Sequence, residues 1–104
     1  MIARIWRGRT PADKANDYLE YVEKTGIDEY QSVEGHCGHY ILRKVKDGVA
    51  ELIVLSFWES MDAVRAFAGP EPEKAVYYPE DEDYLLELED EVEHYDVVYQ
   101  TKKA

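Results

Sequence analysis

The sequence predicts an α+β fold of the ferredoxin-like, split βαβ kind, and three observations carry that prediction. Segments rich in β-branched and aromatic residues alternate with two amphipathic helical patterns in the order β-α-β-β-α-β. A short polar connection, 46–48, joins two of these segments as an antiparallel hairpin. The segment 52–58 is apolar on both faces except at Ser56, which indicates a central strand covered on both sides. We therefore expect a four-stranded antiparallel sheet with both helices on one face.

The first half of the chain supplies a strand, a helix and a second strand. Residues 2–9 form the first strand, and Thr10-Pro11 suits an N-cap followed by proline at the first helical position. From Ala12 onward a helix buries one stripe of apolar residues, with charged residues on its other face. Gly26 either ends this helix or interrupts it, and Gly35 marks the turn into a strand at 36–45.

The second half supplies the other strand of the hairpin, a helix and a final strand. After the strand at 49–58, Ser60 caps a helix that Gly69-Pro70 breaks. The buried stripe of this helix consists of Ala63, Val64, Phe67 and Ala68. Further helical turns are expected at 73–78 and 84–89, an acidic loop at 79–83, and a last alternating strand at 92–101.

Length and charge restrict the class of protein. The 104 residues suffice for one domain, 1–104. A net charge of −11 would repel a nucleic-acid backbone or an anionic lipid surface, so neither partner is expected. A single cysteine, Cys37, and the absence of a signal-peptide pattern or an apolar run of membrane-spanning length predict a soluble, cytoplasmic protein.

The predicted fold leaves one face of the sheet without helices. Residues of the central strand that point to that face are nonetheless apolar. A second identical chain, packed sheet to sheet, is the expected cover, which predicts a homodimer.

Three stretches of the sequence resemble a known family. They are residues 2–8 before Thr10-Pro11, residues 55–60 leading through the second helix to 75–79, and residues 94–98. Together they are similar to the antibiotic biosynthesis monooxygenase family of dimeric α+β barrels. The turn at 57–60, Phe-Trp-Glu-Ser, is the most characteristic piece, and the resemblance covers nearly the whole chain.

The resemblance implies a homodimer with a pocket in each subunit between sheet and helices. Some members of that family oxygenate electron-rich aromatic polyketides or quinols with O₂ and with no metal or flavin, so no cofactor is expected. Others bind and degrade haem through a histidine on the second helix, ten residues after a tryptophan. That spacing falls on Phe67 and Tyr77 in this sequence, so the ligand histidine is missing. Because tyrosinate can also hold haem iron, haem degradation is the enzymatic alternative. A non-catalytic binding or sensing module that uses the same pocket is the alternative from another class.

Cofactor-free oxygenation needs polar groups on an apolar wall, to take a proton from the substrate and to stabilise the resulting anion. The predicted catalytic residues are Tyr77, Trp6 and Arg4. The predicted substrate-binding residues are Phe67, Tyr78, Trp58, Arg7 and His94. The aromatic members are expected to converge on one cavity, with the Tyr77 hydroxyl positioning the developing anion. The alternative for each aromatic residue is a place in the core or at the dimer interface.

Two other clusters predict no site. On a regular strand His36 and His39 would point to opposite faces, and only Cys37 and His39 would share one, so no metal site is expected there. Nine of the fourteen residues from 80 to 93 are acidic, but without the glycine of a calcium loop they predict a solvated loop.

His94 could act as a base oriented by Asp96, or serve as a structural histidine.

Overall fold

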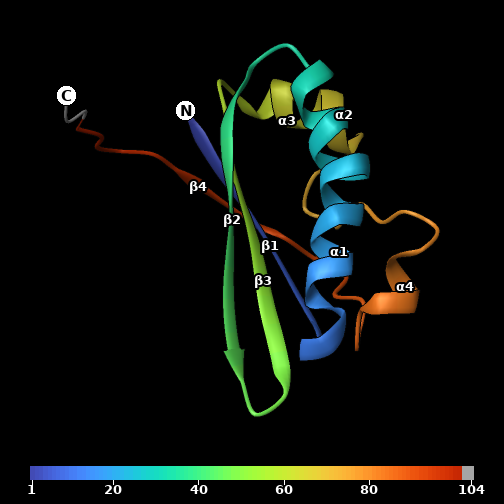
Figure 1. Ribbon diagram of the computed structural model, residues 1–104. Coiled ribbons are helices and arrows are strands. Elements are labelled where there is room, and N and C mark those ends of the chain that lie inside the picture. The colour runs from blue at the N-terminus through green and yellow to red at the C-terminus, as the bar shows by residue number, and fades with distance from the viewer. Residues whose placement is uncertain (102–104) are drawn as a thin grey trace.

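The structure, a computed structural model, describes residues 1–101, except for the side chains at positions 27 and 28. Its four strands form one antiparallel sheet in the order β2-β3-β1-β4 (Figure 1). The strands are β1 (Ile2–Pro11), β2 (His36–Lys46), β3 (Val49–Trp58) and β4 (Glu93–Asp96). This topology confirms the ferredoxin-like α+β fold, although residues 102–104 of the predicted domain lie outside the described residues.

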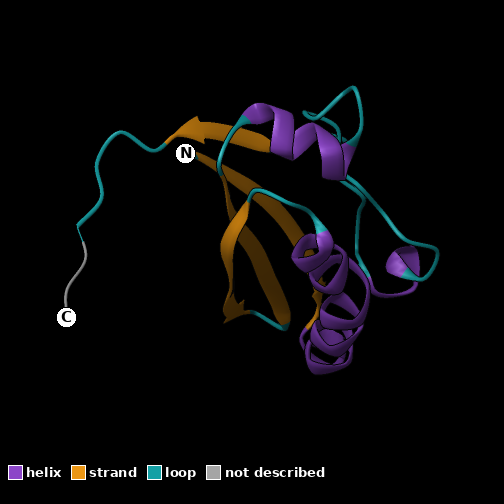
Figure 2. Ribbon diagram, turned by 90° about the horizontal axis from the view of Figure 1, so that it is seen from above, coloured by secondary structure: helices purple, strands orange, loops and turns teal. Residues whose placement is uncertain are grey.

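The main helices lie on one face of the sheet (Figure 2). A 3-10 turn, η1 (Ala12–Lys14), leads into α1 (Ala15–Val22), which continues through a π-helical turn, η2 (Glu23–Ile27), into α2 (Asp28–Ser32). Gly26 therefore interrupts the helix without ending it. A π turn rotates the following residues about the helix axis, and here it precedes Tyr30, which is buried. No helix in the described residues is long and apolar enough to cross a membrane.

The passage from β1 to the first helix differs from the predicted cap. Thr10 remains in the strand, fully buried and paired with Ala50, and Pro11 occupies the N-cap position without a side-chain capping bond. The Ala12 N–H then donates to the Gly48 carbonyl oxygen at 2.9 Å. Because these hydrogen bonds prolong the ladder with β3, the strand extends beyond the residues that propensity alone would assign to it.

The hairpin and the second helix agree with the sequence. β2 and β3 pair from Lys46↔Val49 onward through a turn at Asp47 and Gly48, both of which have positive φ. Ser60 caps α3 (Met61–Ala68), because its Oγ accepts a hydrogen bond from the Ala63 N–H. Gly69, with φ of 90°, ends that helix.

The segment after α3 is more extended than the sequence predicts. Neither helical turn expected at 73–78 and 84–89 forms. Instead Lys74 bridges to Glu91, and the Val92 N–H donates to the Glu73 carbonyl oxygen at 2.8 Å. The single turn α4 (Asp81–Tyr84) lies where an acidic loop was expected. β4 ends at Asp96 rather than 101 because its partner, Ile2, is already the first residue of β1.

The core fills the space between the sheet and the helices. Alternate residues of β3 face inward, and two of them, Leu52 and Trp58, are almost completely buried. Val64 of α3 is also buried in this core. Within the described residues, no helix covers the opposite face of the sheet (Figure 2). The apolar residues of that outer face are Ile5, Tyr40, Leu42, Ile53, Leu55, Phe57 and Tyr95, and the same face carries charged residues that include Arg7, Arg9, Lys44, Glu51 and Glu93. Tyr40 is 63% exposed and Tyr95 is 52% exposed, so a large apolar surface is left open.

Candidate functional site

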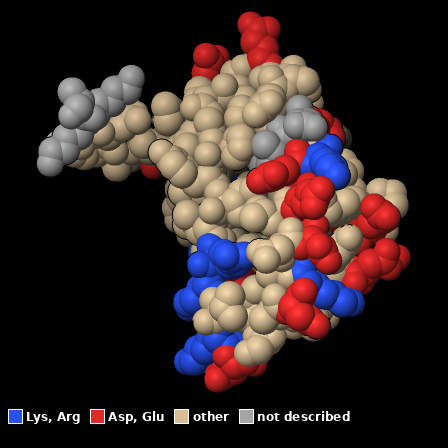
Figure 3. Space-filling model, viewed as in Figure 1, with Lys and Arg blue, Asp and Glu red and all other residues tan. Residues whose placement is uncertain are grey.

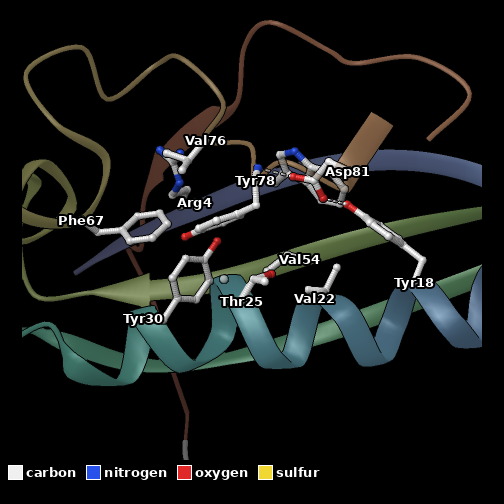
Figure 4. A pocket seen from close by; sticks show the side chains of 12 residues that line it. Arg4, Tyr18, Val22, Thr25, Tyr30, Val54, Phe67, Val76, Tyr78 and Asp81 are labelled. Carbon is white, nitrogen blue, oxygen red and sulfur yellow. Dashed lines mark hydrogen bonds between the residues drawn. The ribbon is translucent and has the colours of Figure 1, made fainter. Parts of the chain in front are cut away.

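A cavity of about 40 Å³ lies between the inner face of the sheet and the helical layer (Figure 4). Its apolar walls come from both layers and its polar groups from β1, the helices α1 and α2, and the segment after α3. The lining residues are Arg4, Trp6, Tyr18, Val22, Thr25, Gly26, Tyr30, Val54, Phe67, Val76, Tyr78 and Asp81. Arg4 and Phe67 lie toward one end of the cavity, and Asp81 and Tyr18 toward the other.

Arg4 is a buried cation whose hydrogen-bond partners are all neutral. Its side chain points inward from β1 and is 2% exposed. Nη1 donates to the Pro72 carbonyl oxygen at 2.6 Å and to His94 Nε2 at 2.9 Å, and Nη2 lies 3.5 Å from the Lys74 carbonyl oxygen. The Nε–H finds no acceptor among the described residues. Burial lowers the pKa of Arg4, and the neighbouring Tyr30 hydroxyl partly offsets that effect.

His94 is held as a hydrogen-bond acceptor by Arg4. A guanidinium can only donate, so Nε2 of His94 must be unprotonated and Nδ1 must carry the proton. Burial, and then the charge of Arg4, lower the pKa of His94. The ring is therefore neutral near pH 7 and supplies no counter-charge.

Tyr30 is a site residue that the sequence analysis did not single out. Its ring packs edge-on against Phe67, with centroids 4.4 Å apart, and against Trp58 at 5.5 Å. Its hydroxyl and that of Tyr78 point toward one another near Arg4 (Figure 4). Burial raises the pKa of Tyr30, which keeps the hydroxyl protonated and able to donate. No motif marks this residue, because its inward position depends on the π turn before it.

Asp81 is the second residue that the sequence analysis missed. Its carboxylate is 5% exposed and accepts hydrogen bonds from the Tyr18 hydroxyl at 2.9 Å and the Tyr78 N–H at 2.6 Å. The Tyr78 hydroxyl donates to Glu29 of α2. Burial raises the pKa of both tyrosines, with a further contribution from the carboxylate that each one contacts. The acidic stretch is therefore only partly solvated, because Asp81 fastens it to α1.

Trp6 forms one wall of the cavity and lies along the strand over Gly8. A Cβ at position 8 would stand 2.4 Å from Trp6 Cη2 and 3.0 Å from Leu85 Cδ2. Glycine at this position therefore allows the indole to lie flat against β1. The buried Trp6 indole N–H has no hydrogen-bond acceptor in the part of the chain that is described.

We predict that Gly8→Ala displaces the Trp6 ring and lowers the free energy of unfolding by about 1–3 kcal/mol, because the added methyl overlaps the indole. Urea denaturation followed by tryptophan fluorescence measures both effects. Gly26→Ala is the control, since a Cβ there would meet only Tyr78 Cε2 at 3.8 Å. Equal midpoints for Gly8→Ala and wild type would show that Trp6 does not depend on this glycine.

Four of the eight site residues predicted from the sequence line this cavity. They are Arg4, Trp6, Phe67 and Tyr78. Trp58 stands behind Phe67, stacked at 5.6 Å between centroids, and its indole N–H donates to Ser56 Oγ at 2.9 Å. His94, another predicted residue, contacts the site only through its hydrogen bond with Arg4.

Tyr77 and Arg7 lie outside the cavity. Tyr77 is on an extended segment, and its hydroxyl donates to the Glu89 carbonyl oxygen at 2.6 Å while its ring makes an edge contact with Trp6, with centroids 6.4 Å apart. The expected convergence of Tyr77 with Tyr78 fails because neighbouring residues of an extended chain point to opposite sides. Arg7 belongs to the other face of β1, where it forms an ion pair with Glu93.

The two histidines of β2 are on the same face, contrary to expectation. A bulge between His36 and Gly38 inserts Cys37 as an extra residue, and Gly38 has φ of 126°. The rings of His36 and His39 consequently stack at 5.3 Å. Cys37 is exposed, and no group of three or more metal-binding side chains occurs within the described ranges.

Comparison with models of known protein families agrees with the fold described above. The sequence profile of the antibiotic biosynthesis monooxygenase family matches residues 1–76. The chain belongs to the antibiotic biosynthesis monooxygenase family. No curated protein matches the sequence.

Solved structures of similar fold include a heme-degrading protein and a protein named as an antibiotic biosynthesis monooxygenase. The heme-degrader MhuD from Mycobacterium tuberculosis, solved with two hemes bound in its active site, has a TM-score of 0.66 at 18% identity, over 98% of this chain and 100% of that chain. A Bacillus cereus protein named after the antibiotic biosynthesis monooxygenases has a TM-score of 0.63 at 23% identity, over 99% and 97% of the two chains. At these identities the likeness establishes the fold.

Proposed function

We propose that this protein is a cofactor-independent monooxygenase that uses O₂ to oxidise a small planar phenol, quinol or polyketide in the cavity. One observation carries the proposal. A buried guanidinium with only neutral partners faces an aromatic-walled cavity, which is the arrangement that stabilises an anion forming on a planar substrate.

The substrate itself supplies the electrons in this chemistry. A phenol with hydrogen on a ring carbon ortho or para to its hydroxyl loses that hydrogen and the hydroxyl proton. One atom of O₂ becomes a new carbonyl on that carbon, and the other leaves as water with the two hydrogens. O₂ is the oxidant, and the ionised phenol is the species that it attacks.

The lining residues divide these tasks in the proposed reaction. Arg4 stabilises the substrate anion, and the protonated Tyr30 hydroxyl donates a second hydrogen bond to it. Asp81 is a carboxylate at the far end of the cavity, and each of its oxygens keeps a lone pair for a substrate proton beside the bond that it already accepts. Trp6 and Phe67 hold the ring in plane by stacking.

An oxygen electrode tests the proposal on a panel of hydroquinones, hydroxynaphthalenes and anthrones with the purified protein. We expect saturable oxygen consumption and a quinone product containing one atom from ¹⁸O₂. Consumption no faster than without protein, together with measurable binding of the same compounds, would favour the binding or sensing module instead.

Haem degradation is the enzymatic alternative, and the residues of the cavity fit haem poorly. The position expected for the iron ligand holds Tyr77, which lies outside the cavity with its hydroxyl bound to a carbonyl oxygen. Tyrosine binds ferric iron as tyrosinate, yet the pKa values of Tyr30 and Tyr78 are raised by burial. We expect no shift of the Soret band when haemin is added, whereas a shift abolished by Tyr78→Phe would support the alternative.

We also propose that two copies of the chain pack through their outer sheet faces into a homodimer. This face joins half-buried Ile5, Ile53 and Leu55 to the exposed Tyr40 and Leu42. Residues 97–101 run away from the body of the molecule beyond β4, with Val98 91% exposed and Tyr99 80% exposed (Figures 1 and 2). A partner sheet would cover both surfaces.

The dimer proposal predicts a strong effect of Leu42→Glu, because the new carboxylate would be buried between two apolar sheets. We expect about a 100-fold weaker dimer, measured by light scattering at micromolar protein concentrations. Leu88→Glu is the matched control, since Leu88 is 43% exposed and Leu42 is 46% exposed, but Leu88 lies outside the sheet. A wild-type particle of 12.1 kDa would contradict the proposal.

A further inference from the structure

Arg4 is buried and has no acidic partner among the described residues, whereas the other four arginines are exposed. One of these, Arg43, donates to the amide oxygen of Asn16. Arg7, Arg9 and Arg65 each form an ion pair with a carboxylate at the surface. The chain contains 23 acidic residues, and in the view of Figure 3 most of the acidic side chains that are visible lie over the helical side. Even so, the recorded hydrogen bonds of Arg4 go to two carbonyl oxygens and a neutral imidazole.

A buried, uncompensated charge is expensive for a folded protein. Taking one ion out of water carries a large desolvation penalty, and neutral hydrogen bonds recover only part of it. Because a guanidinium stays protonated, the charge is present before any reaction begins. A ligand that carries its own negative charge would therefore complete this site in the resting state, whereas a neutral phenol would not.

We propose that the cavity binds a planar aromatic monocarboxylic acid that also carries a phenolic hydroxyl, with its carboxylate on Arg4. The guanidinium edge formed by Nε and Nη2 has the weakest partners, since the buried Nε has no acceptor within hydrogen-bond distance in the described part of the chain and Nη2 has only the 3.5 Å contact to the Lys74 carbonyl oxygen. The Tyr30 hydroxyl lies near this guanidinium and would have to turn aside for a bound carboxylate. Two parallel N–H donors match the two oxygens of a carboxylate.

The opposite end of the cavity restricts the ligand to one negative charge. Asp81 lines that end and would repel a second carboxylate or a phosphate. The same carboxylate accepts a hydrogen bond from a hydroxyl. A ring with a carboxylate at one end and a hydroxyl at the other therefore complements both ends of the cavity.

The volume of the cavity limits the ring system. About 40 Å³ is much less than the roughly 150 Å³ of an engineered cavity that binds benzene, so even one ring must displace part of the wall. Phe67 and Tyr78 are half-buried and can move toward solvent, whereas Trp6, Tyr18 and Tyr30 are fixed in the core. This arrangement favours one or two fused rings.

Binding measurements test the inference without requiring a reaction. Isothermal titration at 0.15 M salt would compare 4-hydroxybenzoate and 6-hydroxy-2-naphthoate with their primary amides, which have the same shape without the charge. We expect at least one acid to bind about 10- to 100-fold more tightly than its amide. Arg4→Met should abolish this preference, and Arg9→Met, which removes an exposed arginine of the same strand, should retain it.

Circular dichroism of each variant would show that it is folded, and Arg4→Lys replaces Arg4→Met if the latter is not. Lysine keeps the charge without the planar edge, so we expect a smaller preference for the acid. Equal binding of acids and amides, a preference that survives Arg4→Met, or binding of none of the four compounds would overturn the inference.

The inference gives Arg4 a different partner from the one in the proposed function, because a carboxylate on Arg4 leaves the phenolic hydroxyl, where the anion would form, at the Asp81 end. It rests on the proposed function only for the fate of the ligand. Acids that bind through Arg4 but consume no oxygen would refute the monooxygenase and leave the carboxylate site standing. Oxygen consumption with neutral hydroquinones, together with no preference for acids, would support the monooxygenase and refute the carboxylate site.

Discussion

Arg4→Met is expected to lower the turnover of an oxygenated substrate by about 100- to 1,000-fold, which is the usual cost of removing one preorganised charge from a developing anion. The effect should fall on kcat more than on KM for a neutral phenol, because the negative charge appears only as the substrate ionises. Oxygen-electrode assays with saturating hydroquinone measure it directly.

Two further variants make this result specific. Arg4→Lys keeps the positive charge without the planar fork and should lie between Arg4→Met and wild type. Arg9→Met should match wild type, because Arg9 is exposed on the outer face and pairs with Glu87. If Arg4→Met turned over as fast as wild type, the role of the buried guanidinium would be refuted, whatever the substrate.

The Tyr77→Phe variant tests whether the Tyr77 hydroxyl, which lies outside the cavity, contributes to turnover. The sequence interpretation placed the anion-positioning hydroxyl at Tyr77, whereas the structure places Tyr30 and Tyr78 at the cavity. We therefore expect Tyr77→Phe to retain most of the turnover and Tyr30→Phe to lose about tenfold or more. The reverse order would restore the original assignment.

The sheet could be predicted from sequence because its signals are local. The continuous apolar run of β3, the Asp47-Gly48 turn and the Ser60 cap each depend on residues a few positions apart. Arg4 and Trp6 share a face because residues two apart on a strand point the same way, and the same rule places Arg7, which the sequence analysis also assigned to the site, on the other face. The common direction of Arg4 and Trp6 needed no information from the rest of the chain.

The remaining site residues depend on contacts between distant parts of the chain. Tyr30 faces the cavity because a π turn precedes it, and no propensity marks such a turn. Asp81 looks like its exposed neighbours in composition, and only its contact with Tyr18, 63 positions away, distinguishes it. In the same way the segment 73–75 becomes extended because it pairs with 90–92, against its local preference.

Asp81→Ala is expected to lower the free energy of unfolding by about 2–4 kcal/mol. The substitution leaves the buried Tyr18 hydroxyl and the Tyr78 N–H without acceptors, and each unsatisfied group costs about 1–3 kcal/mol. It also releases the segment between α3 and β4, because Asp81 joins that segment to α1. Urea denaturation gives the change in stability, and limited proteolysis shows whether 76–90 opens before the rest of the chain.

Asp83→Ala is the matched control, since Asp83 occupies the same turn of α4 and is exposed. It should change stability by less than about 0.5 kcal/mol, as is usual for a surface position. Asp81→Asn separates packing from charge, because its amide oxygen can still accept from Tyr18 while its NH₂ group cannot accept from the Tyr78 N–H. We expect a loss for Asp81→Asn between those of the two alanine variants, and an Asp81→Ala protein as stable as Asp83→Ala would show that this carboxylate does not hold the cavity wall in place.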